Sequence, residues 1–145
     1  MDKIIDIKNI KVNQIAENWK EAIQIAGSSL VECGSIEKKY IDQMIESVET
    51  LGPYIVIMPY FALAHAAPGE SVISSDISIA TFKNDIYFHT ENDPVRIVLC
   101  LACIDKTSHM RKMQKLAKIL MDETIISKIC NCKDEKELFD LFYIQ

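Results

Sequence analysis

The sequence predicts an α/β fold, a three-layer sandwich in which helices cover both faces of a mixed central β-sheet. Apolar residues recur at helical spacing up to residue 52, β-branched apolar stretches follow between residues 54 and 104, and helical spacing then returns. Helices before and after a group of strands are typical of a sheet covered on both faces. The 145 residues contain no Pro/Gly/Ser-rich linker, which predicts a single domain spanning residues 1–145.

Two amphipathic helices are expected first. Asn13 can cap the first helix, which then ends at Gly34. Ser35 can cap the second, which ends at the Gly52-Pro53 pair. The apolar positions at helical spacing are Ile15, Trp19, Ala22, Ile23, Ala26 and Leu30, and then Ile36, Tyr40, Met44, Ile45 and Val48.

Strands are expected in the middle of the chain. The apolar run 54–58 predicts a strand buried on both faces, and the alternation in 75–82 predicts a half-buried strand. Residues 83–85 predict a turn into a short strand at 86–88. The most apolar stretch, 95–104, is expected to be the central strand of the sheet.

Three helices are expected after the central strand. Ser108 or Thr107 can cap the first, and Asp122 can begin a short second one. Asp134, followed three residues later by Glu137, resembles a capping box and predicts the start of the last helix.

Composition excludes several classes of function. The net charge is −5 and the sixteen basic residues are spread along the chain, whereas nucleic-acid binding requires a concentrated basic surface. No apolar run reaches the roughly 18 residues of a membrane span, and the N-terminus does not resemble a signal peptide. These features predict a cytoplasmic protein with no direct membrane insertion. The sequence leaves the oligomeric state open.

His65 is the first candidate for chemistry. It lies between alanines, after an apolar segment and before a Pro-Gly turn, and functional side chains often lie where a strand meets a loop. A neutral imidazole nitrogen can attack phosphorus near pH 7 while the other nitrogen keeps its proton. The alternative is a histidine that merely satisfies its own hydrogen bonds in the core or in a turn.

His109 follows the central strand. If that strand lies beside the one leading to His65, the two imidazoles face each other at one sheet edge, where one takes a phosphoryl group and the other donates to its oxygens. The Thr107 and Ser108 hydroxyls and the free N–H groups of a helix start would add donors. The alternative is that His109 is an ordinary residue of a first helical turn. His89 is expected to be a solvated loop histidine.

Metal or redox chemistry would have to use the five cysteines. Cys100 and Cys103 have Cys-x-x-Cys spacing, but they fall in the expected central strand, where alternate side chains point to opposite faces. Buried small hydrophobes are the preferred interpretation, and Cys130 and Cys132 add no second ligand set. The sequence therefore predicts no metal site and no disulfide. No Gly-rich phosphate loop is present, so no nucleotide cofactor is expected.

Three segments resemble a known family. Residues 51–66, LGPYIVIMPYFALAHA, resemble the GPYIVI…ALxHA segment of the mannitol/fructose-type (type 2) IIA components of bacterial sugar phosphotransferase systems, especially their ascorbate-specific branch. Residues 91–95, ENDPV, resemble the NDPV motif of that branch. Residues 106–109, KTSH, resemble the segment in which these domains keep a second active-site histidine. The similarity extends over nearly the whole chain.

The resemblance implies a phosphotransferase that works without a cofactor. His65 would accept a phosphoryl group from the phosphocarrier protein HPr and pass it to a cysteine of the IIB component, which serves the membrane component IIC. His109 would be the helper histidine, with Thr107 and Ser108 as phosphoryl-stabilising candidates. The apolar residues expected to dock partners and exclude water are Met58, Phe61 and Leu63.

Two departures from the family pattern leave alternatives open. Ala64 and Ala67 stand where many ascorbate-branch members have a proline and an arginine. A lost cationic donor weakens phosphoryl binding, since a charge-assisted hydrogen bond contributes roughly 1.5–3 kcal/mol. One alternative is a regulatory module that is phosphorylated in the same way but binds a transcriptional regulator. The other is a binding domain that has lost phosphoryl transfer.

Overall fold

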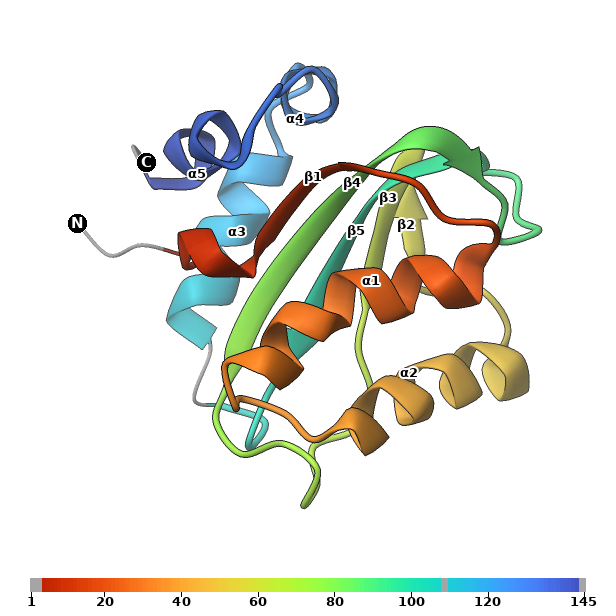
Figure 1. The fold of residues 1–145 in the computed structure, drawn as a ribbon, viewed down its shortest axis with the longest axis vertical. Helices are drawn as coiled ribbons and strands as arrows, with labels where there is room; N and C mark the ends of the chain where they lie inside the picture. Colours follow the sequence, from red (N-terminus) through yellow and green to blue (C-terminus); the bar gives the residue numbers. More distant parts are fainter. Residues whose placement is uncertain (1–3, 108–109, 144–145) are drawn as a thin grey trace.

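A mixed five-stranded sheet covered by helices on both faces forms the frame of the protein (Figure 1). The computed structural model describes residues 4–107 and 110–143. The strand order is β1-β4-β5-β3-β2. The strands are β1 (Ile10–Gln14), β2 (Val56–Met58), β3 (Tyr60–Ala64), β4 (Asp76–Ile86) and β5 (Val95–Ala102). The helices are the 3-10 turn η1 (Ile7–Asn9), α1 (Trp19–Glu32), α2 (Lys38–Leu51), α3 (Met110–Leu120), α4 (Ile125–Cys130) and α5 (Glu135–Tyr143).

Strand β5 is the central strand, as the sequence predicts. It pairs parallel with β3 and antiparallel with β4. Val98 and Cys100 pack with α1 and α2 on one face, whereas Ile97 and Leu99 pack with the C-terminal helices on the other. This alternation buries both faces of the strand and explains why its sequence is a continuous apolar run. The predicted three-layer arrangement is confirmed.

The predicted start of the first helix is wrong. Residues 10–14, where the helix was expected to begin, form the edge strand β1, which pairs parallel with β4. Asn13 adopts a positive φ of 57° and its amide donates to Thr81 Oγ1 (2.9 Å), so it does not cap a helix. The cap is Asn18, whose side chain accepts from the amide of Glu21 at 2.9 Å. A five-residue strand shows too few alternating apolar and polar residues to be recognised in the sequence next to a strong helical pattern.

The second helix also begins later than predicted. It starts at Lys38, and Ser35 uses its hydroxyl to donate to Asp76 Oδ2 at 2.6 Å instead of capping the helix. The predicted end is confirmed: Gly52 has a φ of 91°, which suits glycine, and its amide donates to Val48 O at 2.8 Å.

Two predicted strands differ from the structure. The run 54–58 contains only the short edge strand β2, and Ile57 is 46% exposed, so it is not buried on both faces. The predicted turn at 83–85 is wrong, because β4 continues through Ile86. Its pairing with β5 shifts register after Thr81, and Asn84 binds the backbone of Ala16 through both its amide atoms. A bulge therefore explains the polar residues there.

The C-terminal helices follow the predicted order. The capping role of Asp134 is confirmed, because its Oδ1 accepts from the amide of Glu137 at 2.9 Å. Asp122 begins the turn before α4, with its backbone oxygen accepting from Ile125. At the start of α3, Thr107 O accepts from the amide of Met110 at 3.2 Å, and Ser108 lies outside the described residues. Over 4–107 and 110–143, no helix has the length and apolarity required to cross a bilayer.

Candidate functional site

His65 directly follows β3, at one edge of the sheet. Because β3 and β5 run parallel, with Ala64 opposite Cys100, both strands end at this edge. The strand that precedes the KTSH segment therefore lies beside the strand that leads to His65. His109 and Ser108 lie outside the described residues, so their roles stay predictions.

A backbone carbonyl orients the His65 ring. Nδ1 lies 2.9 Å from the carbonyl oxygen of Leu63, which can only accept a hydrogen bond. This contact assigns the proton to Nδ1 and leaves the lone pair on Nε2. The ring is half-buried, and Tyr54 meets it edge-on with ring centroids 5.5 Å apart. His65 thus combines a fixed tautomer with partial access to solvent, as a nucleophile requires.

The hydroxyl of Tyr40 joins α2 to both strand ends. It accepts from the amide of Ala66 at 3.0 Å, and it lies 3.1 Å from the carbonyl oxygen of Ala66 and 3.0 Å from that of Leu101. Tyr40 is 1% exposed, and burial raises its pKa from 10.0 to about 12, which keeps the hydroxyl neutral. The contact fixes the backbone next to His65, and we identify it here as a positioning contact that the sequence alone did not indicate.

Removal of this hydroxyl is expected to destabilise the fold. In Tyr40→Phe, the Ala66 amide loses its partner, which should lower the free energy of unfolding by about 1–3 kcal/mol. The folded-state pKa lies above the ordinary value, so the stabilisation by neutral Tyr40 is present below pH 10 and is lost as the pH rises toward 12. The stability difference between wild type and variant should shrink over that range.

Urea titrations at pH 7 and at several pH values above 9 would measure both effects. The matched control is Tyr54→Phe, since that ring is 43% exposed and contacts His65 by its ring edge. Equal stability of Tyr40→Phe and Tyr54→Phe at pH 7 would contradict the positioning contact.

A hollow of about 220 Å³ opens beside His65. Its walls include the apolar Pro68 and Leu101 and the charged Asp105 and Lys106. The ammonium of Lys106 is a hydrogen-bond donor in this wall. Its place in the KTSH segment is the signal in the sequence that could have indicated it. An ammonium near a bound phosphoryl group offsets part of its negative charge.

Thr107 is the one of the two predicted phosphoryl-stabilising hydroxyl residues that lies within the described part of the chain, and it contacts Asp105. Its amide lies 2.9 Å and its hydroxyl 3.4 Å from Asp105 Oδ1. These contacts shape the loop that leads toward α3. A phosphoryl-binding role for Thr107 remains a prediction.

The predicted docking residues do not form one surface. Phe61 is fully buried in the core on the side of α3, α4 and α5, so the prediction that it docks a partner is wrong. Met58 ends β2 beside the start of β3, away from His65, and lines a different hollow with Tyr60. Leu63 is half-buried against the same core as Phe61. Strand alternation directs residues 61 and 63 inward, toward the C-terminal helices.

Of the Cys-x-x-Cys pair, only Cys100 lies in β5, so the prediction that both cysteines fall within the central strand is wrong for Cys103. Cys100 is fully buried and Cys103 is half-buried beyond the end of β5, and both are free thiols. Burial raises the pKa of Cys100 to about 12 and also raises that of Cys103. The described part of the chain contains no cluster of three or more His, Cys, Asp or Glu residues that could hold a metal ion.

Thiol labelling should follow this burial. Iodoacetamide at pH 7.5 should modify the exposed Cys33 first and leave the buried Cys100 unmodified in the native protein, because the thiolate is the reactive form. Mass spectrometry of peptides would identify the labelled sites, with urea-unfolded protein as the control. Rapid labelling of native Cys100, or a disulfide from Cys100 to Cys103, would contradict the described burial.

His89 lies in an exposed loop, as predicted. The backbone φ of His89 is 66°. The carboxylate of Asp93 accepts hydrogen bonds from the backbone amides of Phe88, His89 and Thr90 at 2.8–3.1 Å. This network fixes the backbone of the loop.

The sequence and the fold match those of one protein family. The model of the phosphoenolpyruvate-dependent sugar phosphotransferase system EIIA 2 family matches residues 3–144, so the chain belongs to this family. It is 32% identical over 142 residues to the ascorbate-specific EIIA component of Escherichia coli K12, covering 97% of this chain and 92% of that protein.

Solved structures of enzyme IIA proteins have the same fold as this chain. The solution structure of the mannitol-specific cryptic enzyme IIA CmtB from E. coli superposes with a TM-score of 0.89 at 26% identity, covering 99% of this chain and all of that one (100%). The E. coli mannitol enzyme IIA in its complex with phosphorylated enzyme IIB has the same fold, with a TM-score of 0.83 at 23% identity, covering 97% and 98% of the two chains. The chain is thus a phosphotransferase-type component of a sugar uptake system.

Proposed function

We propose that His65 carries a phosphoryl group between phosphorylated HPr and a cysteine of a IIB component in the cytoplasm. The single observation that carries the proposal is the contact of Nδ1 with the Leu63 carbonyl, which leaves Nε2 as the nucleophile on a half-buried ring. The similarity to ascorbate-specific relatives supports an ascorbate-like system, in which IIB passes the group on for uptake through the membrane component IIC.

The first transfer needs little covalent chemistry from the protein. Nε2 of His65 attacks phosphorus in line, the N–P bond of the donor phosphohistidine breaks, and its electron pair stays on the donor nitrogen. The Leu63 carbonyl holds the Nδ1 proton throughout and stabilises the positive charge of the phosphorylated ring. Lys106 offsets charge on the phosphoryl oxygens from the wall of the hollow. We keep His109, Thr107 and Ser108 as proposed further donors.

The second transfer reverses the bond changes. A IIB thiolate attacks phosphorus, an S–P bond forms, and the electron pair of the breaking N–P bond returns to Nε2. The Nδ1 proton never has to move, so the acceptor is restored in its starting tautomer. Pro68 and Leu101 provide apolar walls that limit access of water to the phosphoryl group.

Phosphotransfer from phosphoenolpyruvate tests the proposal. The chain is incubated with enzyme I, HPr and phosphoenolpyruvate, and one acid-labile phosphoryl group per chain is expected by intact mass spectrometry. NMR of the ring nitrogens should place it on Nε2. A control IIA component that is phosphorylated while this chain is not would contradict the proposal and favour a binding module that has lost transfer, the alternative raised by Ala64 and Ala67.

A further inference from the structure

A hollow of about 710 Å³ lies at the opposite end of the sheet from His65. It is bounded by the β2–β3 turn, the end of β4, the start of β5 and α4, whereas His65 follows the other end of β3 (Figure 1). The hollow shares no lining residue with the one beside His65. Small-molecule sites have volumes of roughly 300–1,000 Å³, so this hollow is large enough to hold a small molecule.

A strained residue lines the hollow. Met58 pairs with Phe61, so Pro59 and Tyr60 are the central residues of the turn between β2 and β3. Tyr60 has a φ of 71°, a value that suits glycine at this position of a turn and strains a bulky residue. The Tyr60 side chain is 45% exposed and lines the hollow instead of packing in the core. Backbone strain of this kind is typical of ligand-binding sites.

Irregular strand pairing brings an ion pair to the same hollow. The β3–β5 pairing advances two residues on β5 for one on β3, which makes Arg96 an extra residue of β5. The β4–β5 pairing is irregular just before Ile86, next to Asp85. Bulges redirect side chains and are frequent beside functional sites. Here Arg96 Nε lies 2.6 Å from Asp85 Oδ1, and both residues line the hollow.

The hollow has one unused group of each charge. Asp85 accepts from Nε of the half-buried Arg96, and within the described part of the chain the two Nη groups make no hydrogen bond. Glu123, an exposed residue in the turn before α4, has no hydrogen bond or ion pair among the described residues. The planar fork of an arginine suits a carboxylate, and a free carboxylate suits an ammonium group.

The remaining walls are mainly apolar. Met58, Pro59, Pro94 and Ile126 contribute apolar side chains, and Tyr60 adds an aromatic ring. Small-molecule sites typically combine walls of this kind with a few polar groups that fix the orientation of the ligand. The charged groups and the apolar walls therefore define a ligand with two opposite charges and an apolar body.

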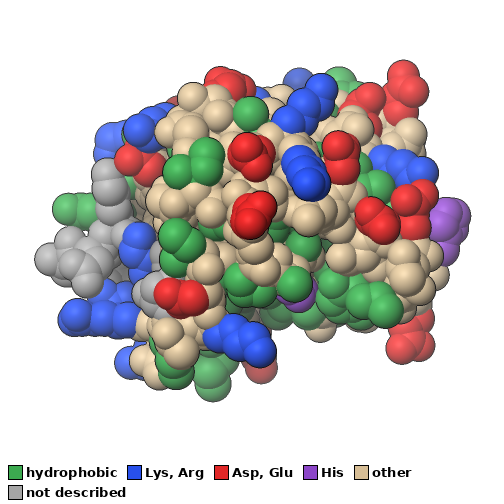
Figure 2. All heavy atoms as spheres, turned by 90° about the horizontal axis from the view of Figure 1, so that it is seen from below, with side chains coloured by type: hydrophobic (Ala, Val, Ile, Leu, Met, Phe, Trp, Pro, Cys, Tyr) green, Lys and Arg blue, Asp and Glu red, His purple; other side chains and the backbone are tan. Residues whose placement is uncertain are grey.

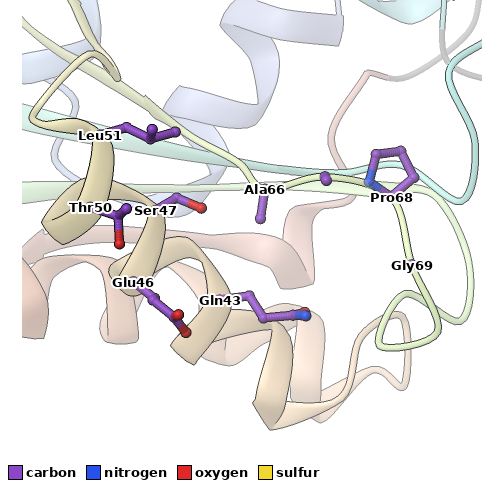
Figure 3. Close-up of a pocket in the computed structure, with 9 residues that line it drawn as sticks. Gln43, Glu46, Ser47, Thr50, Leu51, Ala66, Pro68 and Gly69 are labelled. Carbon is purple, nitrogen blue, oxygen red and sulfur yellow. The ribbon is translucent and has the colours of Figure 1, made fainter.

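The hollow under α2 differs in this respect. Figure 3 shows Gln43 and Ser47 directed toward the 66–69 loop, with Glu46 at the rim. Among the described residues that line it, Glu46 is the one charged side chain, so this hollow has no cation for a carboxylate. Figure 2 views the molecule from this end and shows acidic and basic side chains over the surface. Charges of both signs are thus common on the protein, and their enclosure by apolar walls distinguishes the larger hollow.

We propose that the hollow between the β2–β3 turn and α4 binds a small zwitterion with an apolar body, of the chemical class of apolar dipeptides. Arg96 binds the ligand carboxylate, Glu123 binds its ammonium group, and Tyr60 and Ile126 contact its apolar side chains. A dianion would be repelled by Asp85 and Glu123, and a cation without a carboxylate would leave Arg96 unpaired. The inference goes beyond the proposed function, because it involves no residue of the His65 edge.

The probe is the dipeptide L-leucyl-L-phenylalanine. Its titration into ¹⁵N-labelled protein should give saturable shifts of the backbone amides at 57–61, 95–97 and 123–130, and no shifts at 64–67 beside His65. The N-acetylated and the C-amidated dipeptide each lack one of the two charges. Each blocked form should bind at least about tenfold more weakly, because it loses a charge-assisted hydrogen bond.

Variants test the two charged contacts and the ring. Arg96→Gln and Glu123→Gln should each weaken binding about tenfold or more. Tyr60→Gly removes the ring and relieves the positive φ, so it should weaken binding without loss of stability. Lys20→Gln is the matched control, since it breaks an exposed ion pair to Glu49 (2.8 Å) outside the hollow. Urea unfolding of each variant checks that it is folded.

Cys130 provides a second readout. Its thiol lines the hollow and the residue is half-buried. Bound dipeptide should therefore slow the modification of Cys130 by iodoacetamide. The exposed Cys33 lines a different hollow and is the internal control, because its modification rate should not change.

Three results would overturn the inference. The first is the absence of saturable shifts at about 10 mM dipeptide, a concentration at which a site of millimolar affinity would be largely filled. The second is equal affinity for the dipeptide and its blocked forms, which would indicate apolar contact without charge recognition. The third is unchanged affinity in both Arg96→Gln and Glu123→Gln. Phosphorylation of His65 is measured separately, so failure of this inference is distinguishable from failure of the proposed function.

Discussion

A His65→Ala variant is expected to take up no phosphoryl group, with transfer from phosphorylated HPr below about one-thousandth of the wild-type rate. The substitution removes the only atom, Nε2, that the Leu63 contact leaves free to attack phosphorus. Because the ring is half-buried and follows the end of β3, its loss should cost little stability. Radiolabel transfer from phosphoenolpyruvate through enzyme I and HPr measures the rate.

His89→Ala is the matched control. Its imidazole is exposed in the 87–94 loop and should tolerate removal without any change in phosphorylation. Unfolding curves of both variants confirm that each is folded. An acid-labile adduct that persists in His65→Ala, or that disappears in His89→Ala, would move the acceptor to another residue.

Phe61→Ala is expected to give the largest loss of stability. The Phe61 ring is surrounded by core side chains and is 0% exposed to solvent. Its truncation should therefore lower the free energy of unfolding by about 3–5 kcal/mol. Small domains often have a total stability of about 5–15 kcal/mol, so this is a large share. Urea unfolding followed by tryptophan fluorescence of Trp19 measures it.

Tyr60→Ala is the control for Phe61→Ala, because the two aromatic residues are neighbours in β3 and Tyr60 is 45% exposed. It should change stability by less than about 1 kcal/mol. A Phe61→Ala variant that keeps wild-type stability but loses transfer from HPr would restore the docking role that the burial of Phe61 contradicts.

The sequence predicted most of the architecture because long periodic segments carry a strong signal. The apolar run 95–104 identified the central strand, and Gly52 identified the end of α2. The strand β1 was missed because only Ile10 and Val12 alternate before the helical pattern begins. The bulge at residues 83–85 resembles a turn in the sequence, because polar residues interrupt a strand and begin a turn in the same way.

The site was only partly visible in the sequence. His65 could be found from its own segment, because its neighbours in the chain carry the family pattern. Tyr40 appeared only as an apolar position of a helix, since the contact of its hydroxyl with Ala66 and Leu101 depends on the tertiary fold. Phe61 was assigned to a docking surface because its orientation depends on the pairing of β3 with β5.

The Tyr40 contact also couples the position of the acceptor to that of α2. The Tyr40 hydroxyl contacts the backbone of Ala66, next to His65, and that of Leu101 in β5. A small displacement of α2 would therefore also displace the imidazole and the end of β5. Cavity-creating changes beneath this helix, for example at Met44, should therefore misalign the reacting nitrogen before they unfold the protein. Sensitivity of the chemistry to substitution is expected to extend well into the hydrophobic interior.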